Sequence, residues 1–368
     1  MIGLSITSSW GNGHATTYRG LLGELLKKGH RVLFLERDVP WYAANRDLSA
    51  SNGYTRLYTD LDDLKKKYTR EIRHADFVMI GSYVPDGTAV GEWVIRTAPG
   101  IKAFYDIDTP VTLSRLEKGG ASYLSTELIP HFDLYLSFTG GPTLERLEQR
   151  YGARAAKAFY CSFDPEQYSP RACEQAWDLG YMGTYSKDRQ STLEKLLIEP
   201  AQKWNKGRFI VAGPLYPDHV VWPGNVRRID HLCPAEHRSF YSAQRFTLNV
   251  TRAEMVRSGF SPSVRLFEAA ACGTPIISDY WEGIDTFFEI GREILIAESG
   301  QQVLQYMQEL PELERFNIGQ RARARVLAGH TAAHRASELE QWIYELMGYQ
   351  TKHKSIDNIM SLRSRSEL

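Results

Sequence analysis

Apolar and polar positions alternate along the first half of the chain in blocks that predict strands followed by helices. The runs "IGLSITSS" and "HRVLFLER" are typical of buried strands, and "HATTYRGLLGELLKKG" between them carries its apolar residues at helical spacing. Gly29 provides a stop for that helix. The alternation continues through "ADFVMIGSY", "IKAFYDID" and "FDLYLSF", which predicts a doubly wound parallel sheet.

The pattern is interrupted at residues 164–176, where "DPEQYSPRACEQA" contains two prolines, and then it starts again. We expect Rossmann-like domains over residues 1–165 and 166–335, a helix over 336–350 that crosses back to the first domain, and a flexible tail over 351–368. The predicted fold class is therefore α/β, with two Rossmann-like domains facing a cleft. Open α/β sheets bind ligands at the carboxyl ends of their strands, so we expect the site in that cleft.

Composition limits the possible functions without choosing one. The 368 residues are 43% hydrophobic and 24% charged, and the formal net charge is zero, so nothing global attracts the protein to nucleic acid or to an anionic membrane. The spacing of the four cysteines matches no zinc pattern. No signal peptide and no apolar run long enough to span a membrane is visible, so we expect a cytoplasmic protein with reduced thiols.

The segment "SPSVRLFEAAACG" predicts a short helix with well-defined ends. Ser261 suits the N-cap, Pro262 suits the first helical position, and Gly273 followed by Pro275 suits the stop. The free N–H groups and the positive dipole end of such a helix can bind an anion.

Arg265 and Glu268 lie three residues apart on this helix and therefore share one side of it. One interpretation is a nucleotide site, with phosphates at the helix N-terminus and Arg265, and a ribose diol on the oxygens of Glu268. The other is an ion pair on a solvated surface, which contributes little to stability.

The surrounding sequence favours the first interpretation. The stretch "LFEAAACGTPIISD" resembles the C-terminal donor-binding motif of GT-B glycosyltransferases, and the order "SSWGNGH … DIDTP … RSGFSPSVRLFEAAACGTPIISD" is similar to CgeB-like glycosyltransferases of group 1. The resemblance implies an N-terminal acceptor domain, a C-terminal donor domain, a nucleotide-diphosphate sugar (a UDP-sugar) as donor, and Glu268 on its ribose. It also implies a Glu eight residues earlier, where this chain has Phe260, so retention or inversion of configuration stays open.

Other donor contacts follow from the same resemblance. The loop after the first strand of the second half supplies cations to the diphosphate, and the turn that ends "VAGPLYP" holds the base. Arg252 and Arg257 are expected on a loop before the donor helix, where either can reach phosphate or sugar. The expected donor-binding residues are Glu268, Arg265, Arg189, Lys187, Gly183, Gly213, Ser263, Val264 and Arg252.

The glycine-rich loop "SSWGNGH" follows the first strand. Gly11, Asn12 and Gly13 let backbone N–H groups approach a ligand, and His14 stands where the next helix begins. The resemblance places this loop near the acceptor and leaving group, with His14 as the general base if the enzyme inverts. The alternative is a helix-terminal histidine that only binds backbone.

Asp106 and Asp108 flank Ile107 at a predicted strand end, where alternation puts both carboxylates on one face. A D-x-D pair suits Mg²⁺ or Mn²⁺ in the other glycosyltransferase fold, GT-A, which has one Rossmann-like unit rather than two. We therefore expect no metal, and instead two acidic residues that contact acceptor or orient His14. Asp108 as the cap of the next helix is the alternative.

The sequence thus predicts a metal-independent glycosyltransferase without a cofactor other than its donor. A nucleotide-sugar 2-epimerase and a non-catalytic nucleotide-sugar binding protein are the alternatives on the same fold. For a nicotinamide-dependent oxidoreductase, Glu36 fits the ribose position but "GNGHAT" is not G-x-G-x-x-G. The acceptor can be a glycan, a small molecule, a protein or a modified nucleic acid, and the oligomeric state is not indicated.

Overall fold

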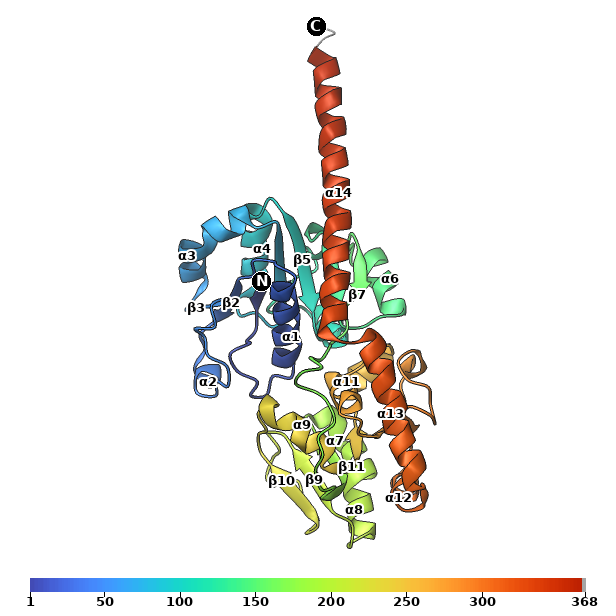
Figure 1. Cartoon of the computed structure of the whole chain (residues 1–368). Coiled ribbons are helices and arrows are strands. Elements are labelled where there is room, and N and C mark those ends of the chain that lie inside the picture. The colour runs from blue at the N-terminus through green and yellow to red at the C-terminus, as the bar shows by residue number, and fades with distance from the viewer. Residues whose placement is uncertain (366–368) are drawn as a thin grey trace.

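A computed structural model describes the backbone of residues 1–365 and the side chains of residues 1–348. Its two domains each contain one parallel sheet, and they lie one above the other in Figure 1. The inner strands are short and largely buried on both faces, as expected where helices cover both sides of a parallel sheet, whereas the edge strands Thr55–Tyr58 and Val226–Ile229 each carry an exposed arginine.

The first sheet has seven strands in the order β3-β2-β1-β4-β5-β6-β7. Its strands are β1 (Ile2–Gly3), β2 (Phe34–Arg37), β3 (Thr55–Tyr58), β4 (Phe77–Gly81), β5 (Ile101–Asp106), β6 (Leu134–Ser137) and β7 (Ala156–Ala158). The α-helices between them are α1 (His14–Lys27), α2 (Pro40–Ala43), α3 (Leu61–His74), α4 (Gly87–Thr97), α5 (Thr109–Glu117) and α6 (Pro142–Gln149).

The second sheet has six strands in the order β10-β9-β8-β11-β12-β13. They are β8 (Trp177–Met182), β9 (Phe209–Ala212), β10 (Val226–Ile229), β11 (Gln244–Asn249), β12 (Ile276–Ser278) and β13 (Leu295–Ile296). The accompanying α-helices are α7 (Lys187–Leu193), α8 (Glu199–Lys203), α9 (Pro234–Ser242), α10 (Ala253–Ser258), α11 (Val264–Ala271), α12 (Gly300–Glu309) and α13 (Glu312–Gly329).

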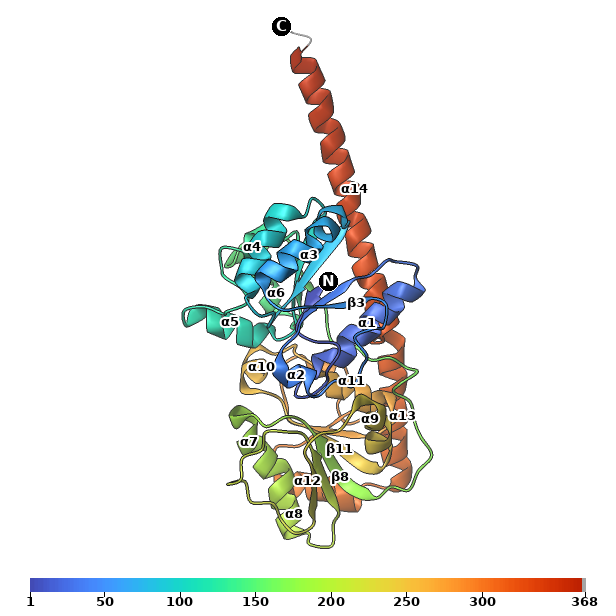
Figure 2. The same cartoon turned by 90° about the vertical axis from the view of Figure 1, so that its left-hand side faces the viewer.

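In both sheets the strand order reverses at the first strand of the domain. In the first sheet β1 lies between β2 and β4, and in the second β8 lies between β9 and β11. Loops that leave strands on either side of such a switch point open a crevice at the carboxyl ends of the strands. Loops of both domains line one cleft between them, and Figure 2 shows α9 of the second domain below α1 of the first.

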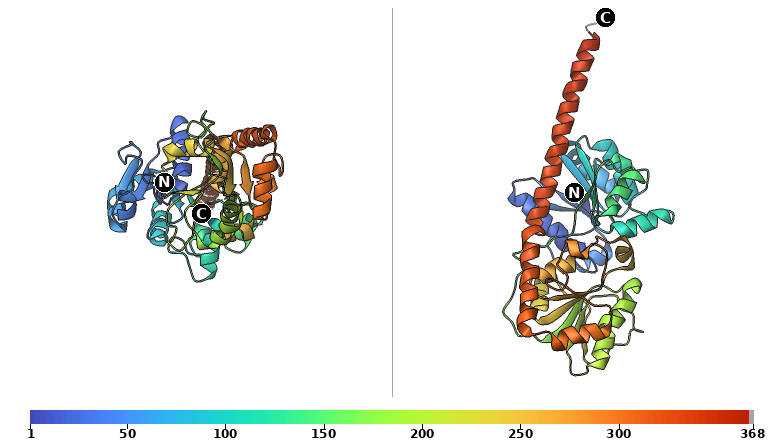
Figure 3. Two further views of the ribbon diagram at one scale, coloured as in Figure 1. Left: turned by 90° about the horizontal axis from the view of Figure 1, so that it is seen from below. Right: turned by 90° about the vertical axis from the view of Figure 1, so that its right-hand side faces the viewer.

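Helix α14 (Ala332–Arg365) leaves the second domain and lies along the first, as both Figure 1 and the right-hand view of Figure 3 show. Ala336 and Leu339 of this helix are buried in one cluster with Tyr18 and Leu21 of α1. We predicted that this helix would span 336–350, but it starts at Ala332 and continues past residue 350, because Gly348 alone is too weak a stop. Residues 351–365, predicted as a flexible tail, belong to the helix. Residues 366–368 of the predicted tail lie outside the described residues, and the predicted domain boundary at residue 165 stays a prediction.

Candidate active site

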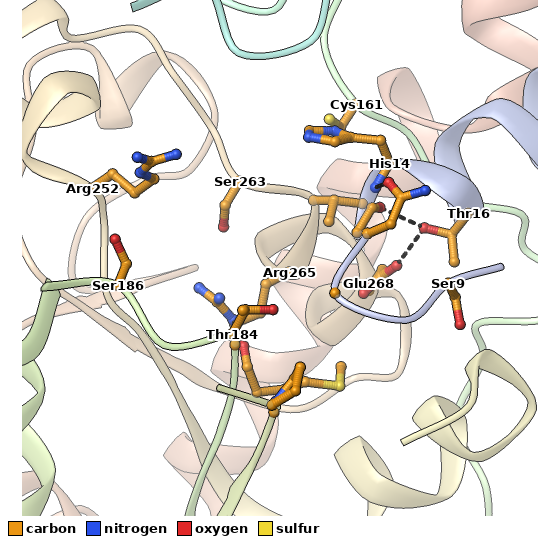
Figure 4. A pocket seen from close by; sticks show the side chains of 18 of the residues that line it. Ser9, His14, Thr16, Cys161, Thr184, Ser186, Arg252, Ser263, Arg265 and Glu268 are labelled. Atoms are coloured by element: carbon orange, nitrogen blue, oxygen red, sulfur yellow. Dashed lines mark hydrogen bonds between the residues drawn. The ribbon is translucent and has the colours of Figure 1, made fainter. Parts of the chain in front are cut away.

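A cleft of about 530 Å³ lies between the two domains. Figure 4 shows its side chains projecting from both, with His14 and Thr16 on one side and Arg265, Glu268 and Arg252 on the other. The predicted site residues that line the cleft are Gly11, Asn12, Gly13, His14, Asp108, Gly183, Arg189, Gly213, Arg252, Ser263, Val264, Arg265 and Glu268. Asp106 and Lys187 are not among the lining residues.

Helix α11 begins at Val264, two residues later than predicted. Ser261 is not the N-cap, because its hydroxyl donates to the Gly259 carbonyl at 2.7 Å and lies 2.8 Å from the Thr139 hydroxyl. Ser263 takes the N-cap position, but its hydroxyl donates to Asn249 Oδ1 at 2.9 Å and does not cap the helix. The first-turn N–H groups are therefore not satisfied by the cap side chain, and this turn lines the cleft. The predicted stop is confirmed, since Gly273 has φ +72°.

Arg265 is a buried and oriented cation. Its Nη1 donates to Asn249 Oδ1 at 2.7 Å, its Nε donates to the Met182 carbonyl, and its guanidinium lies 4.8 Å from the centre of the Tyr181 ring. The side chain makes no ion pair with Glu268 in the described structure, so the surface-pair interpretation is wrong. Its Nη2 has no hydrogen-bond partner in the described structure and lies next to Gly183 at the cleft, so it is a donor that a ligand there could use.

Glu268 is only 3% exposed. Its Oε1 accepts from the Thr16 hydroxyl at 3.2 Å, and its Oε2 accepts from the Tyr241 hydroxyl at 3.3 Å. Burial raises the pKa of this carboxyl to about 7, while the hydroxyls around it and the charge of Arg265 act in the opposite direction. The Tyr168 hydroxyl also interacts with this carboxyl and lowers its pKa. Three hydroxyls therefore use part of the roughly four lone-pair sites of a carboxylate, and at least one site stays available to a ribose hydroxyl.

Gly183 and Gly213 bring two strand ends into contact. Gly213 has φ +146°, and a Cβ there would stand 2.1 Å from the Gly183 carbonyl oxygen. A Cβ on Gly183 would stand 2.9 Å from Arg265 Nη2. Only glycine allows this approach, and it leaves backbone groups of both loops at the cleft surface.

The cations around the diphosphate position are only partly as predicted. Arg189 lines the cleft, and its Nη2 donates to the Thr184 carbonyl at 2.5 Å. Arg252 does not lie in an open loop but N-caps the short helix α10, and its Nη1 is 3.2 Å from Asp108 Oδ2 of the other domain. Arg257 lies within α10, where it pairs with Glu254 at 3.5 Å.

Glu36 fixes the start of the glycine-rich loop. Its two buried oxygens accept from the hydroxyls of Ser5 and Thr7, at 2.8 and 2.5 Å, and from the backbone N–H of Ile6 and Thr7, at 2.8 and 3.0 Å. These four hydrogen bonds occupy the carboxylate that a nicotinamide-dependent oxidoreductase would use for a ribose. The geometry therefore argues against that alternative.

His14 is the first residue of α1, and its backbone N–H donates to Asn12 Oδ1 at 3.3 Å. The His14 ring lines the cleft. Within residues 1–348 the ring has no hydrogen-bond partner, so no hydrogen bond fixes its orientation. Desolvation by burial lowers the pKa of His14, and the nearby Asp108 carboxylate opposes that shift. A neutral imidazole can accept a proton.

Asp106 and Asp108 do not share a face, contrary to our expectation. Strand β5 ends at Asp106, so strand alternation does not extend to Asp108. Asp106 is fully buried and accepts from Thr112 and Tyr135 at 2.8 and 2.7 Å, and burial raises its pKa to about 6. Asp106 does not line the cleft and its carboxyl is enclosed by other side chains, so it cannot contact a ligand there. The structure therefore argues against the predicted catalytic role of Asp106.

Asp108 lies at the cleft, where its Oδ2 accepts from the Tyr83 hydroxyl at 2.5 Å and from Arg252 at 3.2 Å. Its Oδ1 is buried without a hydrogen-bond partner in the described structure. Its side chain does not cap α5. Tyr83 has φ +65°, a strained conformation of the kind that persists at functional sites.

Phe260 takes over a structural role at the position where the resemblance implies a glutamate. It has φ +46°, and its carbonyl accepts from the Gly140 N–H of the first domain at 3.0 Å. Its ring packs between Gly141 and Gly283, where an added Cβ would stand 2.4 Å from the ring in either case. The ring thus connects the two domains.

Sequence reasoning missed several residues of the site. Thr16, Tyr83, His237 and Tyr241 line the cleft. His237 and Tyr241 lie four residues apart on α9, and His237 Nδ1 is 3.9 Å from Glu268 Oε2. Burial lowers the pKa of His237 to about 4, which makes it neutral. The helical spacing of these two on α9 was the one available signal.

Comparisons with known proteins concern the domain and the fold of this chain. Residues 189–341 match the family model described as glycosyl transferase-like. No curated protein matches the sequence. The two-domain α/β architecture is that of the GT-B fold, which confirms the fold class predicted from the sequence, and residues 189–341 carry a glycosyl transferase-like domain; the closer similarity to CgeB-like proteins stays a prediction.

Among solved structures, sucrose-phosphate synthase from Thermosynechococcus elongatus is similar with a TM-score of 0.69 at 13% identity, over 95% of this chain and 99% of that one. Anabaena HepE in complex with UDP-glucose gives 0.66 at 14% identity, over 95% and 99%. An α-glucosyltransferase in complex with UDP-glucose and DNA containing an abasic site gives 0.68 at 13%, over 93% and 98%. At these identities the likeness concerns the fold.

No helix in the described part of the chain is both long and apolar enough to span a membrane.

Proposed function

We propose that the protein transfers a sugar from a UDP-sugar to an acceptor hydroxyl, with its second domain holding the donor and its first domain holding the acceptor. One observation carries the donor assignment. The buried carboxylate of Glu268 lies in the cleft one helical turn from Arg265, without being paired to it. A buried acid with a free lone-pair site beside an oriented cation suits a ribose diol next to a diphosphate. The UDP-glucose bound to two of the similar structures supports uridine as the nucleoside.

The leaving diphosphate would lie against the start of α11. Arg265 and the uncapped first-turn N–H groups provide donors there, and Arg189 lies on the neighbouring loop. Such preorganised donors stabilise charge that develops on a departing phosphate without reorganising during the reaction. Lys187 does not line the cleft, so the proposal rests on Arg189 of that pair.

The acceptor would enter beside the glycine-rich loop and His14. If the enzyme inverts configuration, the neutral imidazole of His14 takes the proton of the attacking hydroxyl, and the charge of Asp108 stabilises the resulting imidazolium. If it retains configuration, the donor phosphate can take that proton and His14 only positions the acceptor. The substitution at Phe260 leaves both courses open. The four cysteines of the protein are free, and we propose a cytoplasmic location on that basis.

A thermal-shift screen tests the donor class. UDP-, GDP-, ADP- and dTDP-sugars are added separately, and binding to the native state raises the midpoint of unfolding. We expect the largest rise with a UDP-sugar, and consumption of that donor only when an acceptor is supplied. A donor converted to its C2 epimer without any acceptor would instead identify an epimerase, and no shift with any nucleotide would contradict the proposal.

A further inference from the structure

Thr16 lies in the first turn of α1, two residues after His14, and is 8% exposed. Its hydroxyl oxygen is 3.2 Å from Glu268 Oε1 in the second domain and 3.2 Å from the Gly13 carbonyl in the glycine-rich loop. Figure 4 shows the Thr16 side chain beside Glu268, with a dashed line for their hydrogen bond. A hydroxyl has one proton, so it donates to one of the two acceptors at a time.

The balance between the two acceptors depends on the state of Glu268. An ionised carboxylate is the stronger acceptor, because charge-assisted hydrogen bonds are stronger than neutral ones. Tyr241 holds the other carboxylate oxygen at 3.3 Å, so Glu268 is tied to α9 on one side and to α1 on the other. With one oxygen held from each domain, the carboxylate plane is fixed for a diol.

We propose that Thr16 is a positioning residue, which orients Glu268 for the donor ribose and connects the occupied donor site to the helix turn that carries His14. The inference rests on the proposed function. When a ribose diol keeps Glu268 ionised and in place, the Thr16 hydroxyl stays on the carboxylate, and the first turn of α1 is held against the second domain. Without that bond the hydroxyl returns to Gly13, and His14 loses its connection to the donor.

A double-mutant cycle tests this inference. UDP binding is measured by calorimetry for the wild type, Thr16→Val, Glu268→Ala and the double variant. We expect Thr16→Val to weaken binding about tenfold, as for loss of a hydrogen bond to a charged group, and to have less than about a twofold effect once Glu268 is gone. Thr16→Ser keeps the hydroxyl and should restore the affinity. With a UDP-sugar, Thr16→Val should also lower kcat at saturating donor, which a purely structural role would not do.

Thr55 provides a matched control. It is a buried threonine far from the cleft, in β3, and its hydroxyl has no hydrogen-bond partner in the described structure. Thr55→Val should leave UDP affinity and kcat unchanged. If Thr16→Val does not fold, Thr16→Ala removes the same hydroxyl and is used in the cycle.

The experiment distinguishes failure of the Thr16 inference from failure of the proposed function. If the wild type binds UDP and Glu268→Ala weakens it, but the Thr16 effect is absent, is equal in both backgrounds or tightens binding, only this inference is overturned. If the wild type does not bind UDP, the proposed function and this inference are both overturned.

Discussion

The two sides of the cleft are built differently. On the second domain, the polar groups for the donor are fixed before any ligand arrives, since Arg265 is held by Asn249 and by a backbone carbonyl. On the first domain, the ring of His14 has no hydrogen-bond partner within the described side chains, although the loop before it is anchored by Glu36. On the proposed function, the difference corresponds to a preformed donor site and an acceptor site that is completed by its ligands.

The largest effect is expected from a substitution of His14, whose ring no hydrogen bond fixes. His14→Ala should lower transfer by on the order of 10²-fold or more if His14 is the general base, because it removes the proton acceptor while leaving Glu268 and Arg265 intact. Donor affinity, measured by calorimetry, should stay unchanged. His74→Ala on the exposed end of α3 is the control and should behave as wild type. Wild-type turnover in the His14 variant would remove it from the mechanism.

The second-domain side of the cleft can be disrupted at the contact between Gly213 and Gly183. Gly213→Ala places a Cβ 2.1 Å from the Gly183 carbonyl at φ +146°, so both the fold and the donor site must move. We expect a loss of about 2 kcal/mol or more in the free energy of unfolding, together with weaker UDP binding.

Gly224→Ala is the matched control for that substitution, because an added Cβ there meets no atom within 4 Å. Urea titration of both variants gives the comparison. Equal stability of the two variants would show that the strand ends are not in fixed contact.

A pH profile sharpens the comparison further. Burial raises the pKa of Glu268 to about 7, and a ribose diol needs the ionised form, so binding should release a proton. The affinity for UDP-glucose, whose diphosphate does not titrate in this range, should rise roughly tenfold from pH 6 to pH 8 and then level off. Glu268→Gln should bind weakly and without this dependence. A profile that is unchanged in Glu268→Gln would assign the titration to another group.

The smallest effect is expected from metal removal. Asp106 is enclosed by Thr112 and Tyr135, and Asp108 is paired with Arg252, so the two carboxylates do not form a joint cation site. Transfer activity in excess EDTA should therefore equal that in buffer. Loss of activity that added Mg²⁺ or Mn²⁺ restores would contradict this assignment.

Contacts between residues close in the sequence could be predicted, whereas contacts between distant segments could not. Arg265 and Glu268 lie three residues apart on one short helix, so their placement on a common side followed from local rules. Thr16 and Tyr241 contact Glu268 from elements far away in the chain, and no local pattern indicates such a contact.

The errors also have physical causes. Ser261 satisfied the composition rule for an N-cap, but the Gly259 carbonyl and Thr139 engage its hydroxyl. Asp106 and Asp108 looked equivalent because the end of β5 between them could not be located from the sequence. Helix and strand types were predictable from periodicity, whereas their last residues were decided by tertiary contacts.

The most direct test of the central claim is a calorimetric titration of UDP-glucose into the wild type and into Glu268→Ala. The account predicts that the wild type binds and that the variant binds at least tenfold more weakly, because the ribose loses its buried acceptor. Equal affinities in the two proteins would contradict the assignment of Glu268 to the donor ribose.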